Sequence, residues 1–233
     1  MGCIHKATGR LISATLFDMD GVLVDSIPIH LQSWNNVFAE LGYPDMTSEQ
    51  YLRSLGRTNA AMLNAYCKEA SIVLTPSELS QILIRKEAVF RENMERDARP
   101  TPGLVAWLDF FNQLGILCSV ASSGTMANIA YILNKLGIAD YFASTVSGMK
   151  FHASKPDPHI FLMAAASLGI QARECLVVED APMGIQAAKA ADMLCCAIAT
   201  SYPREEIASA DIILESLAEV DPSELFMNNE RKK

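Results

Sequence analysis

Two aspartates, Asp18 and Asp20, follow the apolar run at positions 14–17 and stand just before Gly21. A short apolar run that ends in a turn residue predicts a buried strand, and glycine lets the chain turn with a positive φ. Carboxylates this close repel one another unless a cation or a raised pKa relieves them. Because oxygen ligands without histidine or cysteine favour Mg²⁺, the segment predicts a magnesium site. The alternative is a strand that simply ends in an aspartate-containing turn.

More polar residues stand where later strands are predicted to end. Ser122 and Ser123 follow the apolar run 116–121, and Glu179 and Asp180 follow the run 175–178. Parallel strands bring their carboxyl ends to one edge of a sheet, where ligands bind. We therefore expect these side chains to lie near Asp18 and Asp20.

Lys155 adds a cation to this set, in a Ser-Lys-Pro-Asp-Pro loop before a predicted helix. Carboxylates for a metal ion, a hydroxyl group and an ammonium group together favour phosphoryl transfer, which depends on positioning and charge neutralisation. Each residue also has a structural interpretation of its own. Ser122 could cap the following helix, Lys155 could be a solvated loop lysine, and Glu179-Asp180 could be a strand-ending turn.

The elements that must position these residues form two blocks. Between residues 27 and 98 the apolar spacing is helical, and no strand candidate is as strong as the opening one. From residue 104 onward strands and helices alternate, which predicts an α/β fold with a mostly parallel, Rossmann-like sheet flanked by helices. We expect a core domain from residues 1–26 and 99–233, and a four-helix domain inserted at 27–98.

Several local expectations follow from residue patterns. Ser26 is expected to cap the first helix of the inserted block, and residues 227–233 are expected to form a frayed tail. The predicted helices are 29–41, 48–55, 58–69, 77–95, 104–114, 126–136, 158–168 and 182–190. The predicted strands after the first are 116–121, 145–147, 175–178, 194–199 and 211–214.

Composition excludes some classes of function. The chain has 233 residues, half of them hydrophobic, a formal net charge of −8 and an isoelectric point of about 5.0. This charge argues against a nucleic-acid or anionic-membrane partner, and no apolar run is long enough to span a bilayer. The six cysteines lack metal-type spacing. Four of them lie in apolar strand-like runs that favour buried thiols, namely Cys118, Cys175, Cys195 and Cys196, and a reduced, cytoplasmic setting fits best. We expect a monomer whose partner is a small phosphorylated metabolite.

Four segments resemble the motifs of the haloacid dehalogenase superfamily, in the right order and across nearly the whole chain. They are Asp18-x-Asp20-Gly21 with Asp25-Ser26 (motif I), Ala121-Ser122-Ser123 (motif II), Lys155 (motif III), and Val178-Glu179-Asp180 with Gly184 (motif IV). The fuller match is to the β-phosphoglucomutase-like branch, which also holds many sugar-phosphate phosphatases.

The resemblance implies a role for each carboxylate. Asp18 would attack phosphorus and form an aspartyl-phosphate. Asp20 would protonate the leaving oxygen and later accept a proton from the incoming water or sugar hydroxyl. Mg²⁺ would be held by Asp18, the Asp20 backbone carbonyl and Asp180, together with Glu179.

The phosphoryl oxygens would be held by Ser122, Ser123 with the adjacent backbone N–H groups, and Lys155. The inserted helices resemble the cap of this branch, which closes over the site and excludes water. By the same resemblance, His30, Arg57 and Lys86 are candidate substrate contacts on the cap; a structural histidine and a solvated helix face are the alternatives for His30 and Lys86.

One cap loop departs from the mutases. They carry a lysine just before the loop glycine and an arginine three residues after it, where this chain has Leu55 and Asn59. Arg57 could replace one lost cation. The resemblance thus favours a Mg²⁺-dependent phosphatase acting on a small phosphomonoester, a sugar phosphate above all. The alternatives are β-phosphoglucomutase, a haloacid dehalogenase and a non-catalytic binding protein of the same fold.

Overall fold

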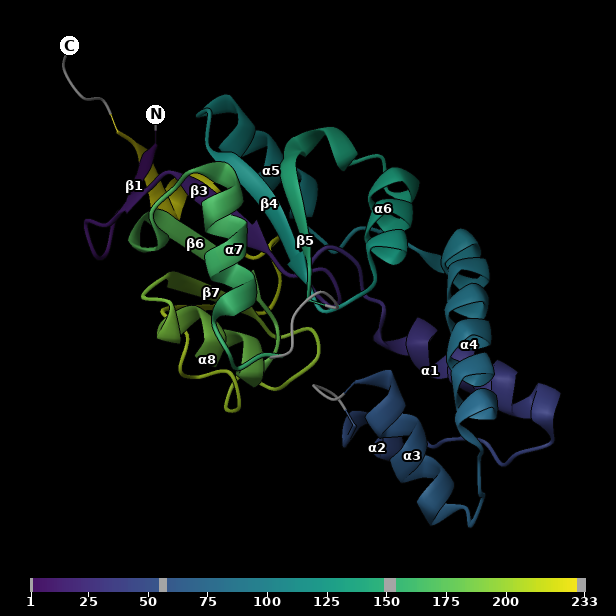
Figure 1. The fold of residues 1–233 in the computed structure, drawn as a ribbon. Coiled ribbons are helices and arrows are strands. Elements are labelled where there is room, and N and C mark those ends of the chain that lie inside the picture. The colour runs from purple at the N-terminus through teal and green to yellow at the C-terminus, as the bar shows by residue number, and fades with distance from the viewer. Residues whose placement is uncertain (1, 55–57, 149–153, 230–233) are drawn as a thin grey trace. The chain divides into compact units, whose positions relative to one another are not determined.

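The computed structural model describes residues 2–54, 58–148 and 154–229 (Figure 1). The chain divides into two compact units. One comprises Met1–Asp25 and Arg99–Lys233, and the other comprises Ser26–Ala98. We refer to them as the core unit and the helical unit.

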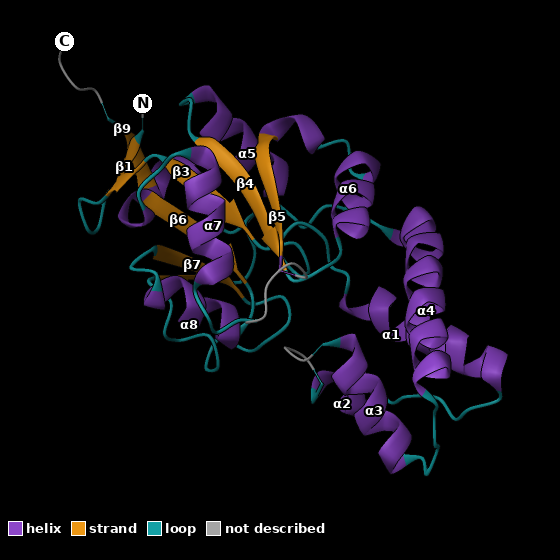
Figure 2. Ribbon diagram, viewed as in Figure 1, coloured by secondary structure: helices purple, strands orange, loops and turns teal. Residues whose placement is uncertain are grey.

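A six-stranded sheet forms the centre of the core unit, in the order β5-β4-β3-β6-β7-β8 (Figure 2). All of its neighbouring strands run parallel. The α/β fold with a parallel sheet is therefore confirmed. The strands are β3 Ala14–Phe17, β4 Leu117–Ser122, β5 Phe142–Ser147, β6 Cys175–Glu179, β7 Leu194–Ile198 and β8 Ile212–Leu214.

Helices cover both faces of this sheet, so its central strands are buried throughout. Successive side chains of a strand point to opposite faces. On β3, Leu16 joins the apolar cluster that includes Phe161 of α7 and Ile185 of α8, whereas the Phe17 ring packs edge-on against Phe111 of α5. The helices are α5 Leu104–Gln113, α6 Met126–Lys135, α7 His159–Leu168, α8 Pro182–Ala190 and the short α9 Pro222–Leu225, with 3₁₀ turns at Ala139–Tyr141 and Ala172–Glu174.

A second, antiparallel sheet of order β2-β1-β9 joins both ends of the described chain. It consists of β1 Cys3–His5, β2 Leu11–Ile12 and β9 Phe226–Asn228. The expected frayed tail is thus wrong for residues 227 and 228. The reason is long-range: β9 pairs with β1, and the buried Phe226 ring packs edge-on against Trp107 and Phe111.

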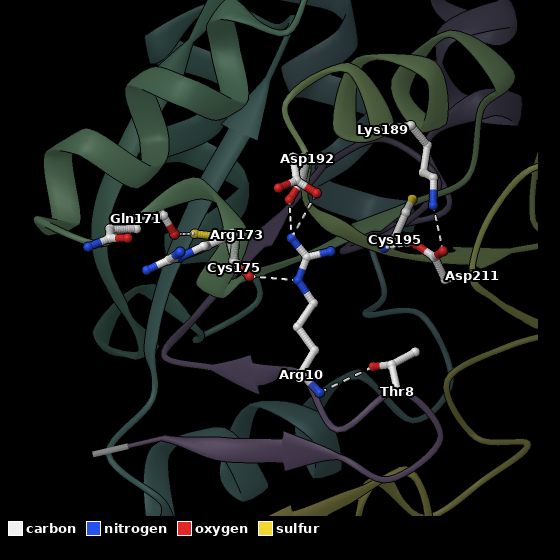
Figure 3. A network of polar contacts seen from close by, with 9 residues as sticks. All are labelled: Thr8, Arg10, Gln171, Arg173, Cys175, Lys189, Asp192, Cys195 and Asp211. Atoms are coloured by element: carbon white, nitrogen blue, oxygen red, sulfur yellow. Dashed lines mark hydrogen bonds and ion pairs between the residues drawn. The ribbon is translucent and has the colours of Figure 1, made fainter.

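Arg10 links this small sheet to the rest of the core unit (Figure 3). Its Nε donates to the Arg173 carbonyl at 2.7 Å, and its Nη2 lies 3.2 Å from Asp192 Oδ1. Beside it in the same view, Lys189 pairs with Asp211 at 2.5 Å. The Arg10 contacts hold the turn between β1 and β2 against the segments that precede β6 and β7.

The described helices of the helical unit are α1 Ile27–Leu41, α2 Ser48–Leu52, α3 Asn59–Glu69 and α4 Pro76–Asp97. They enclose an apolar cluster that includes Trp34, Phe38 and Tyr66. Threonine side chains cap α2, α3 and α4, as the preference for short hydroxyl side chains at this position predicts. Interpretation of this unit as a cap remains a prediction.

Some predicted boundaries are wrong. Helix α2 ends at Leu52 instead of residue 55, and β5 begins at Phe142 instead of residue 145. Ser26 occupies the N-cap position of α1 but makes no side-chain capping bond, because its backbone is helical (φ −96°, ψ −10°) and side-chain capping needs an extended residue there. Helix α7 begins at His159 instead of residue 158, and Asp157 Oδ1 accepts from the His159 N–H at 2.9 Å.

All six cysteines are buried free thiols, which confirms their structural interpretation. Burial raises the pKa of the Cys118 and Cys175 thiols to about 12, so both stay protonated near neutral pH. In the described parts of the chain, no helix is both long enough and apolar enough to cross a membrane.

Two glycines test how tightly the core unit is packed. Gly103 and Gly137 both have positive φ, but a Cβ at Gly103 would lie 2.3 Å from the Ala218 nitrogen, whereas a Cβ at Gly137 would meet nothing within 4 Å. We expect Gly137→Ala to cost about 1–2 kcal/mol through its left-handed backbone alone. Gly103→Ala should cost about 1–3 kcal/mol more, since backbone must move. Urea denaturation measures both, and equal losses would contradict the tight packing at Gly103.

Candidate functional site

The register of the central strands brings the predicted site residues to one edge of the sheet. Phe17 of β3 is opposite Val120 of β4 on one side and opposite Val178 of β6 on the other. The residues that follow these strands therefore meet at their carboxyl ends. The backbone N–H of Asp18 continues the ladder by donating to the Val178 carbonyl at 3.0 Å.

Lys155 joins two carboxylates at this edge. Its Nζ lies 2.6 Å from Asp18 Oδ1 and 2.5 Å from Glu179 Oε1, and 4.9 Å from the centre of the Phe161 ring. Glu179 is 1 % exposed and Asp18 is 7 % exposed. The second oxygen of Glu179 accepts from the backbone N–H of Asp180 at 2.8 Å. Lys155 is therefore not a solvated loop lysine but the shared cation of a buried triad.

Burial and nearby charges shift the pKa values of Asp18 and Lys155. Burial raises the pKa of Asp18 to about 7; Lys155 opposes this rise, and the negative charges of Glu179 and Asp20 add to it. Burial acts to lower the pKa of Lys155, but the charges of Asp18 and Glu179 outweigh it and hold that pKa above its usual value. The ammonium group therefore stays charged at neutral pH.

Asp180 is buried at 4 % exposure on the same edge, and its Oδ2 accepts a hydrogen bond from Ser201 Oγ. Burial raises its pKa, and the charges of Glu179 and Asp18 add to this rise. A Cβ on Gly21 would lie 1.8 Å from this same Oδ2, and φ at Gly21 is +79°. Only glycine therefore fits beside the Asp180 carboxylate.

Gly184 leaves room for the Glu179 carboxylate, as Gly21 does for that of Asp180. It lies in the first turn of α8, and a Cβ there would lie 1.8 Å from Glu179 Oε1. The glycines of the first and last motifs thus each allow a carboxylate to pack against backbone. Close approach, as well as backbone freedom, explains why these positions are glycine.

The donor chemistry of the site suits a hard cation. Within residues 2–54, 58–148 and 154–229, no three histidine, cysteine, aspartate or glutamate side chains are arranged to hold a metal ion by themselves. Mg²⁺ needs fewer protein ligands, because it keeps waters and binds substrate oxygens beside one or two carboxylates. Asp18 and Asp180 supply two such carboxylates, and the charge of Asp18 disfavours ionisation of Asp180. A cation would relieve this repulsion, so the residues fit Mg²⁺.

Asp20 and the serines have different surroundings. Asp20 is partly exposed in the turn after β3, where Gly21 donates its N–H to the Val24 carbonyl at 2.8 Å. Ser122 is fully buried, and its Oγ accepts the Gly124 N–H at 3.0 Å. Ser123 is exposed at the end of β4. Ser122 thus shapes the loop that presents Ser123, and a direct phosphate contact of either serine stays a prediction.

The predicted cap residues lie in the helical unit, apart from Arg57, which falls outside the described residues. Lys86 is fully buried, so a solvated helix face is the wrong interpretation for it. Its Nζ lies 2.8 Å from His30 Nδ1 and 3.1 Å from Glu87 Oε1. Asn59 Nδ2 donates to the same Glu87 oxygen at 2.8 Å. We call these four residues the Lys86 cluster; its lysine charge is balanced by Glu87.

Ser201 is a site residue that the motifs do not predict. It lies in the loop after β7, two positions past the predicted strand 194–199, and belongs to none of the four motifs. Polar residues gather at the carboxyl ends of parallel strands, and the place of Ser201 just past a predicted strand is the one sequence signal for it.

Breaking the Lys155 triad tests its role in the fold. Lys155→Met leaves Asp18 and Glu179 buried without their shared cation, and losing one partner of a buried ion pair costs about 3–5 kcal/mol. We expect urea denaturation in metal-free buffer at pH 7 to show a loss of about this size. The double variant Lys155→Met/Glu179→Gln removes one charge of each sign and should regain part of the loss. An unchanged midpoint for Lys155→Met would contradict this account of the triad.

Comparisons with known proteins identify relatives of this chain. The chain is 28% identical over 226 residues to hexitol phosphatase B of Escherichia coli, covering 94% of this chain and 99% of that one. It is 27% identical over 212 residues to β-phosphoglucomutase of Bacillus subtilis, covering 90% and 92%. It also matches 82% of its length to 18% of the chloroplastic protein SUPPRESSOR OF QUENCHING 1 of Arabidopsis thaliana, at 32% identity.

A solved structure shares the fold. It is CbbY from Rhodobacter sphaeroides in complex with phosphate, with a TM-score of 0.80 and 25% identity, covering 89% of this chain and 96% of that one. The family model described as haloacid dehalogenase-like hydrolase matches residues 15–198, which include all four motifs. With phosphatases and a phosphoglucomutase among its relatives, the chain belongs to the haloacid dehalogenase-like hydrolases.

Proposed function

We propose that this protein is a Mg²⁺-dependent phosphatase that hydrolyses a small phosphomonoester, a sugar or polyol phosphate, through an aspartyl-phosphate on Asp18. The observation that carries the proposal is the buried Asp18 carboxylate at the carboxyl edge of the sheet. Lys155 forms an ion pair with this carboxylate and a second one with Glu179. A buried nucleophile beside a fixed cation suits an attack on a negatively charged phosphoryl group.

The carboxylates of motif I divide the reaction between them. An Asp18 oxygen forms a bond to phosphorus while the bond from phosphorus to the ester oxygen breaks, and Asp20 gives that oxygen its proton. Asp20 then accepts a proton from water, whose oxygen attacks phosphorus and frees the Asp18 carboxylate and inorganic phosphate. The partial exposure of Asp20 suits a group that must exchange protons with substrate and water.

The remaining polar groups neutralise charge. Asp18, Asp180 and the Asp20 carbonyl would hold Mg²⁺, with Glu179 beside them. When bound, the ion lowers the repulsion between the nucleophile and the phosphoryl oxygens. Lys155 stabilises the negative charge of Asp18 and of the phosphoryl oxygens during the transfer. The loop of Ser122 and Ser123 offers backbone N–H groups and a hydroxyl to the phosphate. Lys155 is already charged before substrate binds, so it needs no proton transfer to act.

We propose that side chains of the helical unit select the substrate. His30, Lys86 and Arg57 are the proposed contacts. In the Lys86 cluster, Lys86 pairs with Glu87, and Asn59 donates to the same Glu87 oxygen. A carboxylate and an amide suit the hydroxyl groups of a sugar or polyol, whereas the Glu87 carboxylate disfavours the second phosphate that a mutase must hold in its bisphosphate intermediate. The similarity to hexitol phosphatase B supports the same choice.

The mutase remains the second candidate, because β-phosphoglucomutase of Bacillus subtilis is similar over 90% of this chain. Both reactions would use the same Asp18 intermediate and differ in whether water or a sugar hydroxyl accepts the phosphoryl group. We further propose that the protein acts as a monomer in the cytoplasm, where its six free thiols stay reduced.

Asp18→Asn tests the nucleophile. The amide keeps the size of the side chain but cannot form an aspartyl-phosphate, so turnover should fall by at least about a thousandfold while the protein stays folded. Phosphate release from a panel of sugar and polyol phosphates measures this, with circular dichroism as the folding check. Asp140→Asn, an exposed position on the 3₁₀ turn, is the matched control. Substantial turnover by Asp18→Asn would contradict the assignment of Asp18 as the nucleophile.

One assay separates the phosphatase from the mutase. The protein is incubated with Mg²⁺, β-glucose 1-phosphate and a trace of glucose 1,6-bisphosphate, and free phosphate and glucose 6-phosphate are followed together. We expect little glucose 6-phosphate, with phosphate release here or from another member of the panel. EDTA should abolish that release, and excess Mg²⁺ should restore it. Fast glucose 6-phosphate with little phosphate would establish a mutase instead.

A further inference from the structure

The Asp180 carboxylate is held on two sides by segments distant in sequence. Ser201 Oγ donates to its Oδ2, and the same oxygen lies so close to Gly21 that a Cβ there would be 1.8 Å away. A Cβ on Gly21 would also lie 2.8 Å from Ser201 Oγ. The hydroxyl, the carboxylate and the turn after β3 therefore meet in one small volume.

The loop that carries Ser201 is anchored on both sides. At its start, Ala199 donates its N–H to the Leu214 carbonyl at 2.9 Å, and Tyr202 packs against the apolar cluster of the sheet. Further along, Ile207 is fully buried in that cluster. Ser201 is thus placed by the scaffold, and its hydroxyl can fix a neighbouring side chain.

We propose that Ser201 is a positioning residue that holds the Asp180 carboxylate in the orientation required to bind a divalent cation. The hydrogen bond to Oδ2 restricts rotation of the carboxylate and so sets the direction in which its oxygens face a bound cation. Hydrogen bonds from outside the ligand set commonly orient a metal ligand in this way. The inference rests on the proposed Mg²⁺-dependent phosphatase and adds a residue outside its four motifs.

The test measures metal affinity directly. Mn²⁺ stands in for Mg²⁺, since both favour carboxylate, carbonyl and water ligands, and electron paramagnetic resonance of free Mn²⁺ gives the dissociation constant of the full chain. We expect Ser201→Ala to weaken binding by about tenfold. Ser201→Thr keeps the hydroxyl and should stay within about twofold. Ser209→Ala, an exposed serine of the same loop, should match the wild type.

A second readout separates positioning from stability. Ser201→Ala should raise the Mg²⁺ concentration needed for half-maximal phosphate release by a similar factor, with the KM for substrate at saturating Mg²⁺ unchanged. Wild-type affinity in Ser201→Ala, or a lower melting temperature with no change in Mn²⁺ affinity, would overturn the role of Ser201. A wild-type protein that binds Mn²⁺ but hydrolyses no phosphomonoester would overturn the proposed function and leave the affinity test of Ser201 intact. A wild-type protein without Mn²⁺ binding would overturn both.

Discussion

The interaction on which the site depends is the ammonium group of Lys155 between the buried carboxylates of Asp18 and Glu179. Without a cation, two carboxylates buried so near each other could not both stay ionised. The ion pairs connect the loop before α7 to the ends of β3 and β6, so three separate segments are held in one arrangement. Gly21 and Gly184 allow the carboxylates of Asp180 and Glu179 to pack against backbone. The groups that fix the structure are thus the ones to which the motifs assign the chemistry.

Much of this arrangement could be predicted from the sequence because it follows from local patterns. The apolar run before Asp18 and the alternation of strands and helices each depend on a few neighbouring residues. The meeting of polar residues at one sheet edge follows from the parallel order. The haloacid dehalogenase-like family assignment rested on the same short segments and is confirmed.

What could not be predicted depends on contacts between distant residues. The polar sequence of residues 227–233 predicts a frayed tail, yet the pairing of β9 with β1 decides the structure of residues 227 and 228. The complete burial of Lys86 depends on rings and a carboxylate that surround it in the folded unit: its Nζ lies 5.0 Å from the centre of the Phe90 ring and 5.6 Å from that of Trp34. No pattern along α4 reveals these neighbours. Ser201 belongs to none of the four motifs, and no residue pattern around it predicts its hydrogen bond to Asp180.

The place of β3 in the sheet has a consequence for how the protein is made. This strand leaves the ribosome well before its partners, which are β4, beginning at residue 117, and β6, beginning at residue 175. Until both have been synthesised, its apolar residues lack their neighbours, and non-local pairing of this kind is slow and exposes chains to aggregation. The helical unit, by contrast, is continuous in sequence from residue 26 to 98. Its whole segment is therefore synthesised before β4 and β6, the strands with which β3 pairs.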